Sequence, residues 1–405
     1  FLQNNTMRCP EPTDDFLPCC WQAGEMQKKR CDGLSTEECS SRVALAKKYT
    51  LAGGPYTNMV FPEAKPEEWL NCDQCNDCFK PAFNYRPKTT IEEGVNQFIE
   101  ILQKQDYSLL LTYDGIVALI LPIIPLLLFL EVFLGFIYKK PQTKVYKVIF
   151  LIYLFNRVLG RFIAIGMVAL CIGALQPFAI IKTSMTWYWF IYGYIIWEFA
   201  HFIYHFLAHK VRLFWCLHAT HHSPEEMNLS VSHAHFFLEA PYADFIRTSI
   251  CILMGLDPIM LFTIMFIDGT YGAFIHVGEN LIKDARFGFL NKIVLTPSHH
   301  RVHHARNPLY LDTNYCNLLN IWDRIFGTYQ EENPDLDIDY GITRPINSGN
   351  FIHVYFGEII HLTRDVINAP GILNKLRYVF YPPGWSHESD YQTAKMIRES
   401  YLKKV

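Results

Sequence analysis

Four long apolar stretches dominate the chain beyond residue 110. They are Ile116–Tyr138, Phe162–Ile181, Met185–Trp197 and Phe245–Ile267. The first is a 23-residue run broken only by Glu131, and the second carries no charge over 20 residues. About 20 apolar residues suffice for a helix to cross the roughly 30 Å of bilayer hydrocarbon. The pattern predicts three membrane-spanning helices and one helical hairpin, which turns around Asp257-Pro258 and returns near His276.

Basic residues follow the predicted inner ends of these stretches and set their orientation. They are Lys139, Lys140, Lys144, Lys147, Lys210, Arg212, Lys283, Arg286 and Lys292. By the positive-inside rule these ends face the cytosol. Beyond Tyr340 the polarity is mixed, and Phe351–Tyr381 has the pattern of amphipathic helices that lie along a membrane surface.

The polar N-terminal part holds eight of the twelve cysteines within residues 1–110. An even number of cysteines in such a stretch indicates a disulfide framework in a lumenal or extracellular domain. The glycosylation sequon Asn4-Asn5-Thr6 agrees with that side of the membrane. A start on Phe1 fits a cleaved signal peptide or a trimmed chain. Two alternatives stay open: zinc at Cys72, Cys75 and Cys78, and a cytosolic domain with reduced thiols.

The expected fold class is therefore an all-α integral membrane protein with a small disulfide-rich N-terminal domain. We divide it into residues 1–110 outside the cytosol, 111–350 as the membrane domain with its cytosolic cap, and 351–405 as a cytosolic amphipathic tail. An oxidising outer side exists at both the endoplasmic reticulum and the plasma membrane, so the sequence does not choose between them. The net charge of −3 argues against a nucleic-acid partner.

Histidine is the residue whose distribution points to chemistry. Thirteen of the 16 histidines fall between His201 and His304, where uniform scatter would place about four. Residues three or four apart lie on one face of a helix, so each cluster predicts a stripe of imidazoles. The clusters are His201/His205/His209, His218/His221/His222 and His299/His300/His303/His304, and His233, His235 and His276 stand between them.

Neutral imidazole is the commonest nitrogen ligand of divalent transition metals. Three helical clusters supply eight or more nitrogens, too many for one tetrahedral zinc and enough for two metals. A two-metal centre with open positions could activate O₂ for hydroxylation of an unactivated carbon. Glu198, Asn228 and Glu279 are expected to orient imidazoles through the ring nitrogen that does not bind the metal. Spacing alone does not separate iron from zinc, nor metal-binding from structural roles for His201, His233 and His235.

At these residues the chain resembles the membrane-bound fatty acid hydroxylase superfamily. The three boxes are His205-x3-His209, His218-x2-His221-His222 and His300-x2-His303-His304. Further segments, such as Trp322-Asp-Arg-Ile-Phe-Gly-Thr328 and Tyr340-Gly-Ile-Thr-Arg-Pro-Ile-Asn347, are similar to its alkylglycerol monooxygenase branch. The resemblance implies as metal ligands the eight box histidines and His276, which occupies the isolated histidine of the family. Glu198, Asn228, Glu279 and His299 complete the candidate catalytic set.

The resemblance also implies two iron ions, O₂ as oxidant and a membrane lipid as substrate. In the branch it implies tetrahydrobiopterin as electron donor and opening of an alkylglycerol ether after hydroxylation of its α-carbon. The chain departs from the branch at Glu198, which stands where an Asp is usual, and at Glu279, three rather than two places after His276. The cysteine-rich domain is foreign to the branch, and the usual C-terminal spans are absent.

Two alternative functions stay open. One keeps the metal centre but hydroxylates a sterol, sphingolipid or fatty acyl chain with a cytochrome b5-type donor. The other is a non-catalytic assembly protein whose cysteine-rich domain binds a protein partner.

Overall fold

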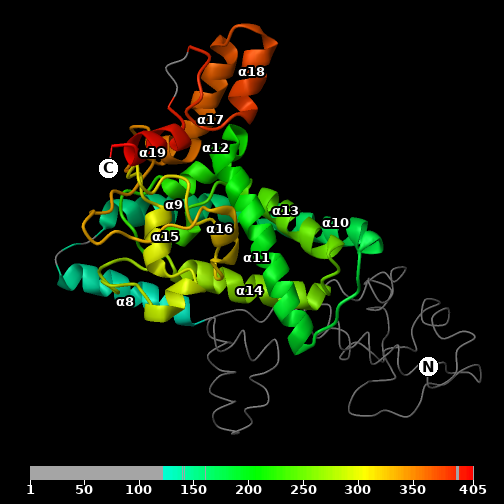
Figure 1. The fold of residues 1–405 in the computed structure, drawn as a ribbon. Coiled ribbons are helices and arrows are strands. Elements are labelled where there is room, and N and C mark those ends of the chain that lie inside the picture. Colours follow the sequence, from blue (N-terminus) through cyan, green and yellow to red (C-terminus); the bar gives the residue numbers. More distant parts are fainter. Residues whose placement is uncertain (1–121, 139, 141, 160, 389–391, 405) are drawn as a thin grey trace, which may run out of the picture. The chain divides into compact units, whose positions relative to one another are not determined.

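The computed structural model describes residues 122–138, 140, 142–159, 161–388 and 392–404 (Figure 1). Within these residues the regular structure is helical, without a β-strand and with two isolated backbone bridges. The predicted all-α class is confirmed for this part of the chain. The cysteines of residues 1–110, the sequon at Asn4 and the start of the first apolar stretch lie outside the described residues.

The described residues from Ile123 onward form one compact unit, and its helices have the following bounds. The α-helices are α8 (Ile123–Ile137), α9 (Thr143–Leu159), α10 (Arg161–Leu175), α11 (Trp187–Lys210), α12 (Arg212–His222), α13 (Glu239–Leu253), α14 (Pro258–Phe274), α15 (Pro297–His303), α16 (Ile321–Phe326), α17 (Phe351–Asn368), α18 (Gly371–Phe380) and α19 (Ala394–Leu402). Three short 3₁₀ helices are η3 (Gln176–Phe178), η4 (Leu229–His233) and η5 (Gly288–Lys292). In the described residues no helix is at once long enough and apolar enough to cross a membrane.

Helices α13 and α14 form the predicted helical hairpin, and its turn lies at Gly255–Pro258. Asp257 caps α14 by accepting hydrogen bonds from the backbone N–H groups of Ile259 and Met260, and Pro258 occupies the first turn. Gly255 has a φ of 87°, and a Cβ there would lie 2.0 Å from the carbonyl oxygen of Ile181. Only glycine fits this turn without strain.

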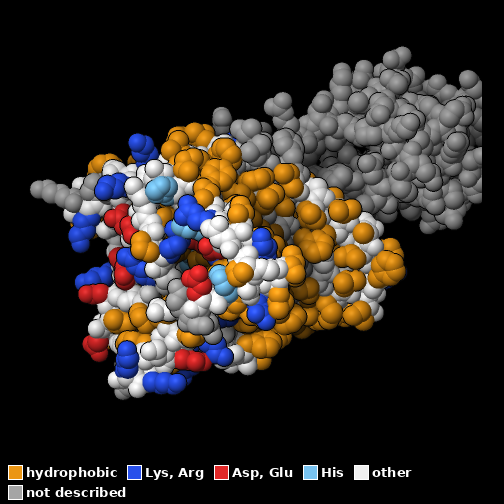
Figure 2. All heavy atoms as spheres, turned by 90° about the horizontal axis from the view of Figure 1, so that it is seen from above, with side chains coloured by type: hydrophobic (Ala, Val, Ile, Leu, Met, Phe, Trp, Pro, Cys, Tyr) orange, Lys and Arg blue, Asp and Glu red, His pale blue; other side chains and the backbone are white. Residues whose placement is uncertain are grey.

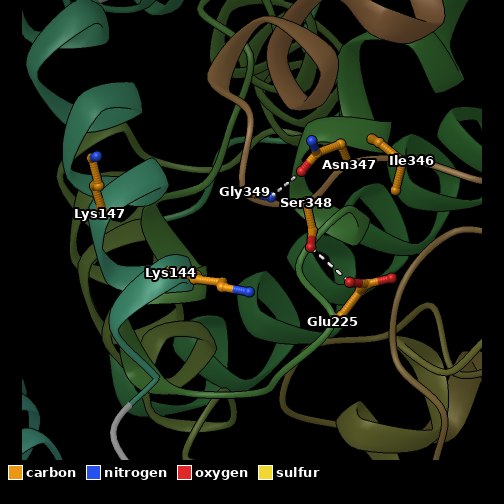
Figure 3. A pocket seen from close by; sticks show the side chains of 7 residues that line it. All are labelled: Lys144, Lys147, Glu225, Ile346, Asn347, Ser348 and Gly349. Atoms are coloured by element: carbon orange, nitrogen blue, oxygen red, sulfur yellow. Dashed lines mark hydrogen bonds between the residues drawn. The ribbon is translucent and has the colours of Figure 1, made fainter.

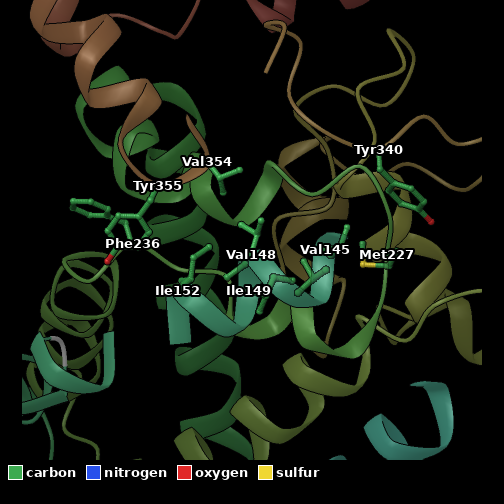
Figure 4. Close-up of a cluster of buried hydrophobic side chains, with 11 residues drawn as sticks. Val145, Val148, Ile149, Ile152, Met227, Phe236, Tyr340, Val354 and Tyr355 are labelled. Carbon is green, nitrogen blue, oxygen red and sulfur yellow. The ribbon is translucent and has the colours of Figure 1, made fainter. Parts of the chain in front are cut away.

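Two apolar cores hold the unit together. One fills the bundle of α10, α11, α13 and α14 and includes the fully buried Trp197, Met260 and Ile264. The other joins α9 to the loop after α12 and to α17 (Figure 4), with Ile152 and Tyr355 among its buried members. The first cluster includes residues of α11, and the second packs against α12, so each of the helices that carry the first two histidine clusters is anchored to a core.

The irregular segment between α15 and α17 is ordered by buried polar side chains. Asp323 accepts hydrogen bonds from the backbone N–H groups of Tyr315 and Cys316, both 2.8 Å long, and from the Thr328 hydroxyl. Asn314 adopts a positive φ of 58° and bonds to the backbone of Gln330 in both directions. These contacts fix the direction of the carbonyl groups in residues 313–315.

Helices α17 and α18 confirm that residues 351–381 are helical and amphipathic. Together they pack against α12 and α9 and, in Figure 1, project from the rest of the unit. An ion pair between Arg212 and Asp365 ties them to the start of α12.

Candidate metal centre

Nine buried histidines come together in two groups, and they are the nine that the sequence nominated as ligands. Within each group, one ring nitrogen of every member lies within 4.8 Å of the others. Group one is His205, His209, His218, His222 and His303; group two is His221, His276, His300 and His304. The two groups adjoin, since the rings of His222 and His304 stack with their centroids 4.4 Å apart.

Helical periodicity explains how a few short elements supply both groups. On α12, His218 and His222 are one turn apart and serve group one, whereas His221 points to group two. On α15 and its C-cap, His300 and His304 are likewise one turn apart and serve group two, while His303 serves group one. Helix α11 adds only to group one, and His276, just after α14, adds only to group two.

Three group-one imidazoles have their Nδ1 atom bonded away from the group. Nδ1 of His205 lies 2.9 Å from the carbonyl oxygen of Tyr315, and Nδ1 of His303 lies 2.7 Å from that of Thr313. Nδ1 of His218 lies 2.5 Å from a carboxylate oxygen of Glu239. Carbonyls and carboxylates accept hydrogen bonds, so each Nδ1 carries the proton and each Nε2 keeps a free lone pair.

These lone pairs face one another. Nε2 of His218 lies 3.0 Å from Nε2 of His205 and 3.1 Å from Nε2 of His222. Two unprotonated nitrogens cannot hydrogen-bond, and a cation bound between His205 and His218 would remove the repulsion between their lone pairs. The buried Nε2 atoms of His209 and His303 also have no hydrogen-bond partner in the described part of the chain. Buried polar atoms without a partner are rare, and a metal ion would satisfy all of these nitrogens.

Group two repeats the arrangement around His276. Its Nδ1 lies 2.6 Å from the carbonyl oxygen of Gly272, which leaves the Nε2 lone pair pointing at the group. That Nε2 is 3.1 Å from Nε2 of His221 and 2.9 Å from Nε2 of His300. Nε2 of His304 completes the set at 3.1 Å from Nε2 of His300.

The nitrogen spacing indicates the kind of metal site. Two nitrogens about 2.1 Å from one ion lie about 3.0 Å apart at a right angle, and about 3.4 Å apart in a tetrahedron. The observed spacings of 2.9–3.1 Å fit right-angle pairs. Group one offers five donors, one more than a tetrahedral zinc site takes, and group two offers four.

Burial keeps the box histidines in the form that binds metal. Removal from water lowers the pKa of His303 to about 3, although its hydrogen bond to Thr313 opposes the shift. Burial likewise lowers the pKa of His222 and of His304 well below the ordinary range, and the neighbouring imidazoles lower it further. The three side chains are neutral at pH 7, and neutral imidazole is the ligand form.

Glu239 is the residue that the sequence analysis missed. It is buried, begins α13, and bonds to His218, to His235 and to the Tyr204 hydroxyl. Burial raises the pKa of its carboxyl group, but His235 and His218 lower it more, so the net shift is downward. The available signal was the His235-x3-Glu239 spacing, with Pro241 marking the first turn of a helix.

The three residues expected to orient imidazoles, Glu198, Asn228 and Glu279, form hydrogen bonds to other groups. Glu198 accepts hydrogen bonds from the backbone N–H groups of residues 317–319, at 2.8 to 3.2 Å. Asn228 caps η4 through Ser230 and donates to Gln142. Glu279 accepts from the Tyr340 hydroxyl and lies 3.8 Å from Nε of Arg301. Within the described residues these hydrogen bonds do not reach a histidine of either group, whereas Glu239 bonds to His218.

The remaining clustered histidines lie outside both groups. His299 belongs to a capping box with Thr296 at the start of α15, and its Nε2 lies 2.8 Å from the Tyr329 hydroxyl. His201 lies 3.8 Å from Asp268, and His233 meets the Tyr153 ring edge-on. His235 stacks on His221, with ring centroids 4.5 Å apart and planes 12° apart.

A surface pocket of about 620 Å³ lies apart from both groups (Figure 3). It is lined by Lys144, Lys147, Glu225, Ile346, Asn347, Ser348 and Gly349. Lys144 points toward the hydrogen-bonded pair of Glu225 and Ser348, whereas Lys147 points away from them. None of the nine histidines lines it.

The fold and site define a helical protein with a buried two-part polyhistidine centre, and sequence comparisons show which known proteins are similar over this part of the chain. Residues 190–328, which carry all of the histidines of both groups, match the fatty acid hydroxylase family. The similarity drawn from the histidine boxes is thus confirmed for these residues.

Individual relatives refine the comparison. The chain is 37% identical to alkylglycerol monooxygenase of Homo sapiens over 202 residues, which is 49% of this chain and 42% of that protein. It is 31% identical to alkylglycerol monooxygenase of Caenorhabditis elegans over 49% of this chain and 40% of that protein. It is also 31% identical to an ornithine lipid hydroxylase of Rhizobium tropici over 39% of this chain and 47% of that protein. The matches thus span less than half the length of these curated relatives. No solved structure matches the chain.

Proposed function

We propose that the chain is an O₂-dependent lipid monooxygenase with two iron ions in the histidine groups. The observation that carries the proposal is the pair of adjoining groups, in which outward hydrogen bonds on Nδ1 leave Nε2 lone pairs facing each other. Iron is among the metals that imidazole ligands suit. When bound, two such ions would supply O₂ activation and the oxidising power to hydroxylate an unactivated carbon.

The chain's own residues would hold the metals and keep the reaction away from bulk water. Group one would hold one ion and group two the other, with His222 and His304 in ring contact between them. Every member of both groups is at most 8% exposed. The carbonyl groups of Tyr315, Thr313 and Gly272 would fix the orientation of three ligands.

A lipid substrate is supported by the names of the relatives and by the surface of the unit. The matched proteins are named for alkylglycerols and for ornithine lipid. Hydrophobic side chains gather over the half of the unit that holds α10 and α13, and charged side chains gather over the other half (Figure 2). Ile165, Leu170 and Phe245 are all more than half exposed on these two helices. We propose that this apolar face lies in the membrane and receives the substrate, with the histidine groups on the cytosolic side.

The first test is metal analysis of the purified chain beside His221→Ala, His303→Ala and His353→Ala. His221 belongs to group two and His303 to group one, whereas His353 is exposed on α17 and serves as the matched control. We expect about two iron equivalents in wild type and in the control, and about one or fewer in each of the other variants. Fewer than one transition-metal equivalent in wild type would contradict the proposal.

The second test identifies substrate and electron donor. An alkylglycerol, a fatty acyl lipid, a sterol and a sphingolipid would be incubated with the iron-loaded chain, with tetrahydrobiopterin or with a cytochrome b5-type donor. We expect cleavage of the alkylglycerol that depends on tetrahydrobiopterin, because four of the relatives carry that enzyme's name. Hydroxylation of another lipid with the cytochrome-type donor alone would assign the alternative. No turnover in the presence of two bound irons would favour an assembly role.

A further inference from the structure

Glu239 reaches toward both histidine groups with different oxygens of one carboxylate. We propose that Glu239 is a positioning residue that couples the two metal positions, holding a ligand of group one directly and a ligand of group two through His235. The inference rests on the proposed function to the extent that both groups bind metal. It adds a specific consequence: metal at one position changes the affinity of the other.

On the group-one side, Oε1 of Glu239 holds the central ligand. It lies 2.5 Å from Nδ1 of His218 and also accepts the Tyr204 hydroxyl at 2.7 Å. Nε2 of His218 in turn lies within 3.1 Å of the Nε2 atoms of both His205 and His222. A small shift of this ring would therefore change three ligand nitrogens at once.

On the group-two side, Oε2 of Glu239 fixes His235. It lies 2.9 Å from Nδ1 of His235, whose Nε2 lies 2.9 Å from the carbonyl oxygen of Ser232. With both ring nitrogens engaged, the plane of the His235 ring is fixed. That ring stacks on His221 at 4.5 Å with planes 12° apart.

The stacking matters for His221 because no hydrogen bond fixes the far side of its ring in the described residues. Its Nδ1 is buried and has no hydrogen-bond partner within the described residues, unlike Nδ1 of His276 in the same group. Among the ring contacts of His221, His235 is the ring that lies flat against it, whereas His276 and His304 meet it edge-on. Nε2 of His221 lies 3.1 Å from Nε2 of His276. Glu239 thus orients one ligand in each group.

The carboxylate is well placed for such a role because its own position is fixed. Glu239 is 2% exposed and is the first residue of α13, which packs along both α10 and α11. A purely structural role also exists for an acidic residue in the first turn of a helix, where it stabilises the helix dipole. The two roles differ in what the metal measurement shows.

The experiment is equilibrium dialysis of the full chain against graded Fe²⁺ under anaerobic conditions, with bound iron measured by mass spectrometry. The variants are Glu239→Gln, His235→Ala and His235→Phe. The matched control is Glu358→Gln. Glu358 lies on α17 and is not a member of either group, and its native carboxylate pairs with Arg344. For wild type and control we expect two ions per chain, bound cooperatively.

For Glu239→Gln we expect both affinities to fall by about 10- to 100-fold, the usual effect of losing a partner behind a metal ligand, and cooperativity to be lost. For His235→Ala we expect weaker binding of one ion only. His235→Phe keeps a ring over His221 without the bond to Glu239, so it should recover that affinity but not the cooperativity. The two His235 variants carry the test if Glu239→Gln does not fold, as judged by circular dichroism.

Two results would overturn the proposal in distinguishable ways. If wild type binds two ions and Glu239→Gln binds them with unchanged affinity, Glu239 is a structural residue of α13 and the coupling fails while the proposed function stands. If wild type binds no iron, the proposed function fails and the coupling fails with it.

Discussion

The orientation of a ligand histidine is best defined when its second ring nitrogen has a partner, and for three of the nine histidines that partner is a backbone carbonyl. The carbonyl groups of Tyr315, Thr313 and Gly272 take the Nδ1 protons of three ligands. The positions of the histidines follow from helical spacing and could be predicted, because residues four apart share a face. The carbonyl partners could not be predicted, since a backbone oxygen has no signature in the sequence.

Glu198 shows that a residue on the same helix face as a box histidine can still be too far away to contact it. It precedes His205 by seven residues on α11 and therefore shares its side of the helix. Seven residues also advance about 10 Å along the axis, which places the carboxylate too far away to touch that imidazole. It bonds instead to three backbone N–H groups at 317–319.

We expect Glu198→Gln to reduce stability without changing metal content. The amide nitrogen would face at least one backbone N–H donor, and an unsatisfied buried donor costs on the order of 1–3 kcal/mol. Chemical denaturation would measure the loss of folding free energy, and mass spectrometry the bound iron. A normal stability with a missing metal ion would show that Glu198 acts on the metal groups after all.

At the scale of elements, the apolar pattern predicted helices more reliably than it predicted their lengths. The helical hairpin and its turn at Asp257 were predicted, and α11 extends the third apolar stretch into the first histidine box. The second stretch was expected as one apolar run of 20 residues, whereas α10 ends at Leu175 and the 3₁₀ helix η3 follows it. The irregular segment 305–350 had no periodicity to detect, because buried side chains such as Asp323 organise it.

Glu131 is what joins α8 to the rest of the unit. It is 1% exposed and accepts hydrogen bonds from the backbone N–H groups of Gly278, at 2.7 Å, and Leu229, at 2.8 Å. Gly278 follows His276 by two residues, so the helix is attached to the segment that carries a group-two ligand. A side chain at Gly278 would not fit, since a Cβ there would lie 2.4 Å from the carbonyl oxygen of Met227.

We expect Glu131→Ala to destabilise the fold by about 2–4 kcal/mol, because two buried N–H groups lose their acceptor. Because Gly278 is near His276, group two should lose metal before group one. Leu130→Ala is the matched control, since Leu130 is 38% exposed on the same helix. Iron content and denaturation midpoint measured together check the prediction, and equal behaviour of the two variants would refute it.

At the scale of the whole molecule, the metal groups connect segments that are distant in the chain. Their ligands come from α11, α12, the end of α14 and α15. A ligand that binds only the folded state stabilises it by about 2.7 kcal/mol at 100 times its dissociation constant. Removing the metals with a chelator should therefore lower the melting temperature, and Fe²⁺ should restore it. In the combined variant His221→Ala/His303→Ala the chelator should have little effect, and an equal decrease there would show that the chelator acts elsewhere.

The apolar face extends over the same unit and gives the last prediction. Ile165 and Leu170 on α10 are 60% and 63% exposed, a large apolar area for a surface in contact with water. If this face lies in lipid, a lysine at each position costs on the order of 3 kcal/mol. Ile165→Lys/Leu170→Lys should then reduce binding to phospholipid vesicles in a flotation assay by at least about 100-fold. Met396→Lys on α19, 43% exposed in the native chain, introduces the same charge away from this face and should float like wild type. Full flotation of the α10 variant would mean that another surface of the chain holds the membrane, and the substrate would then have to reach the histidine groups from water.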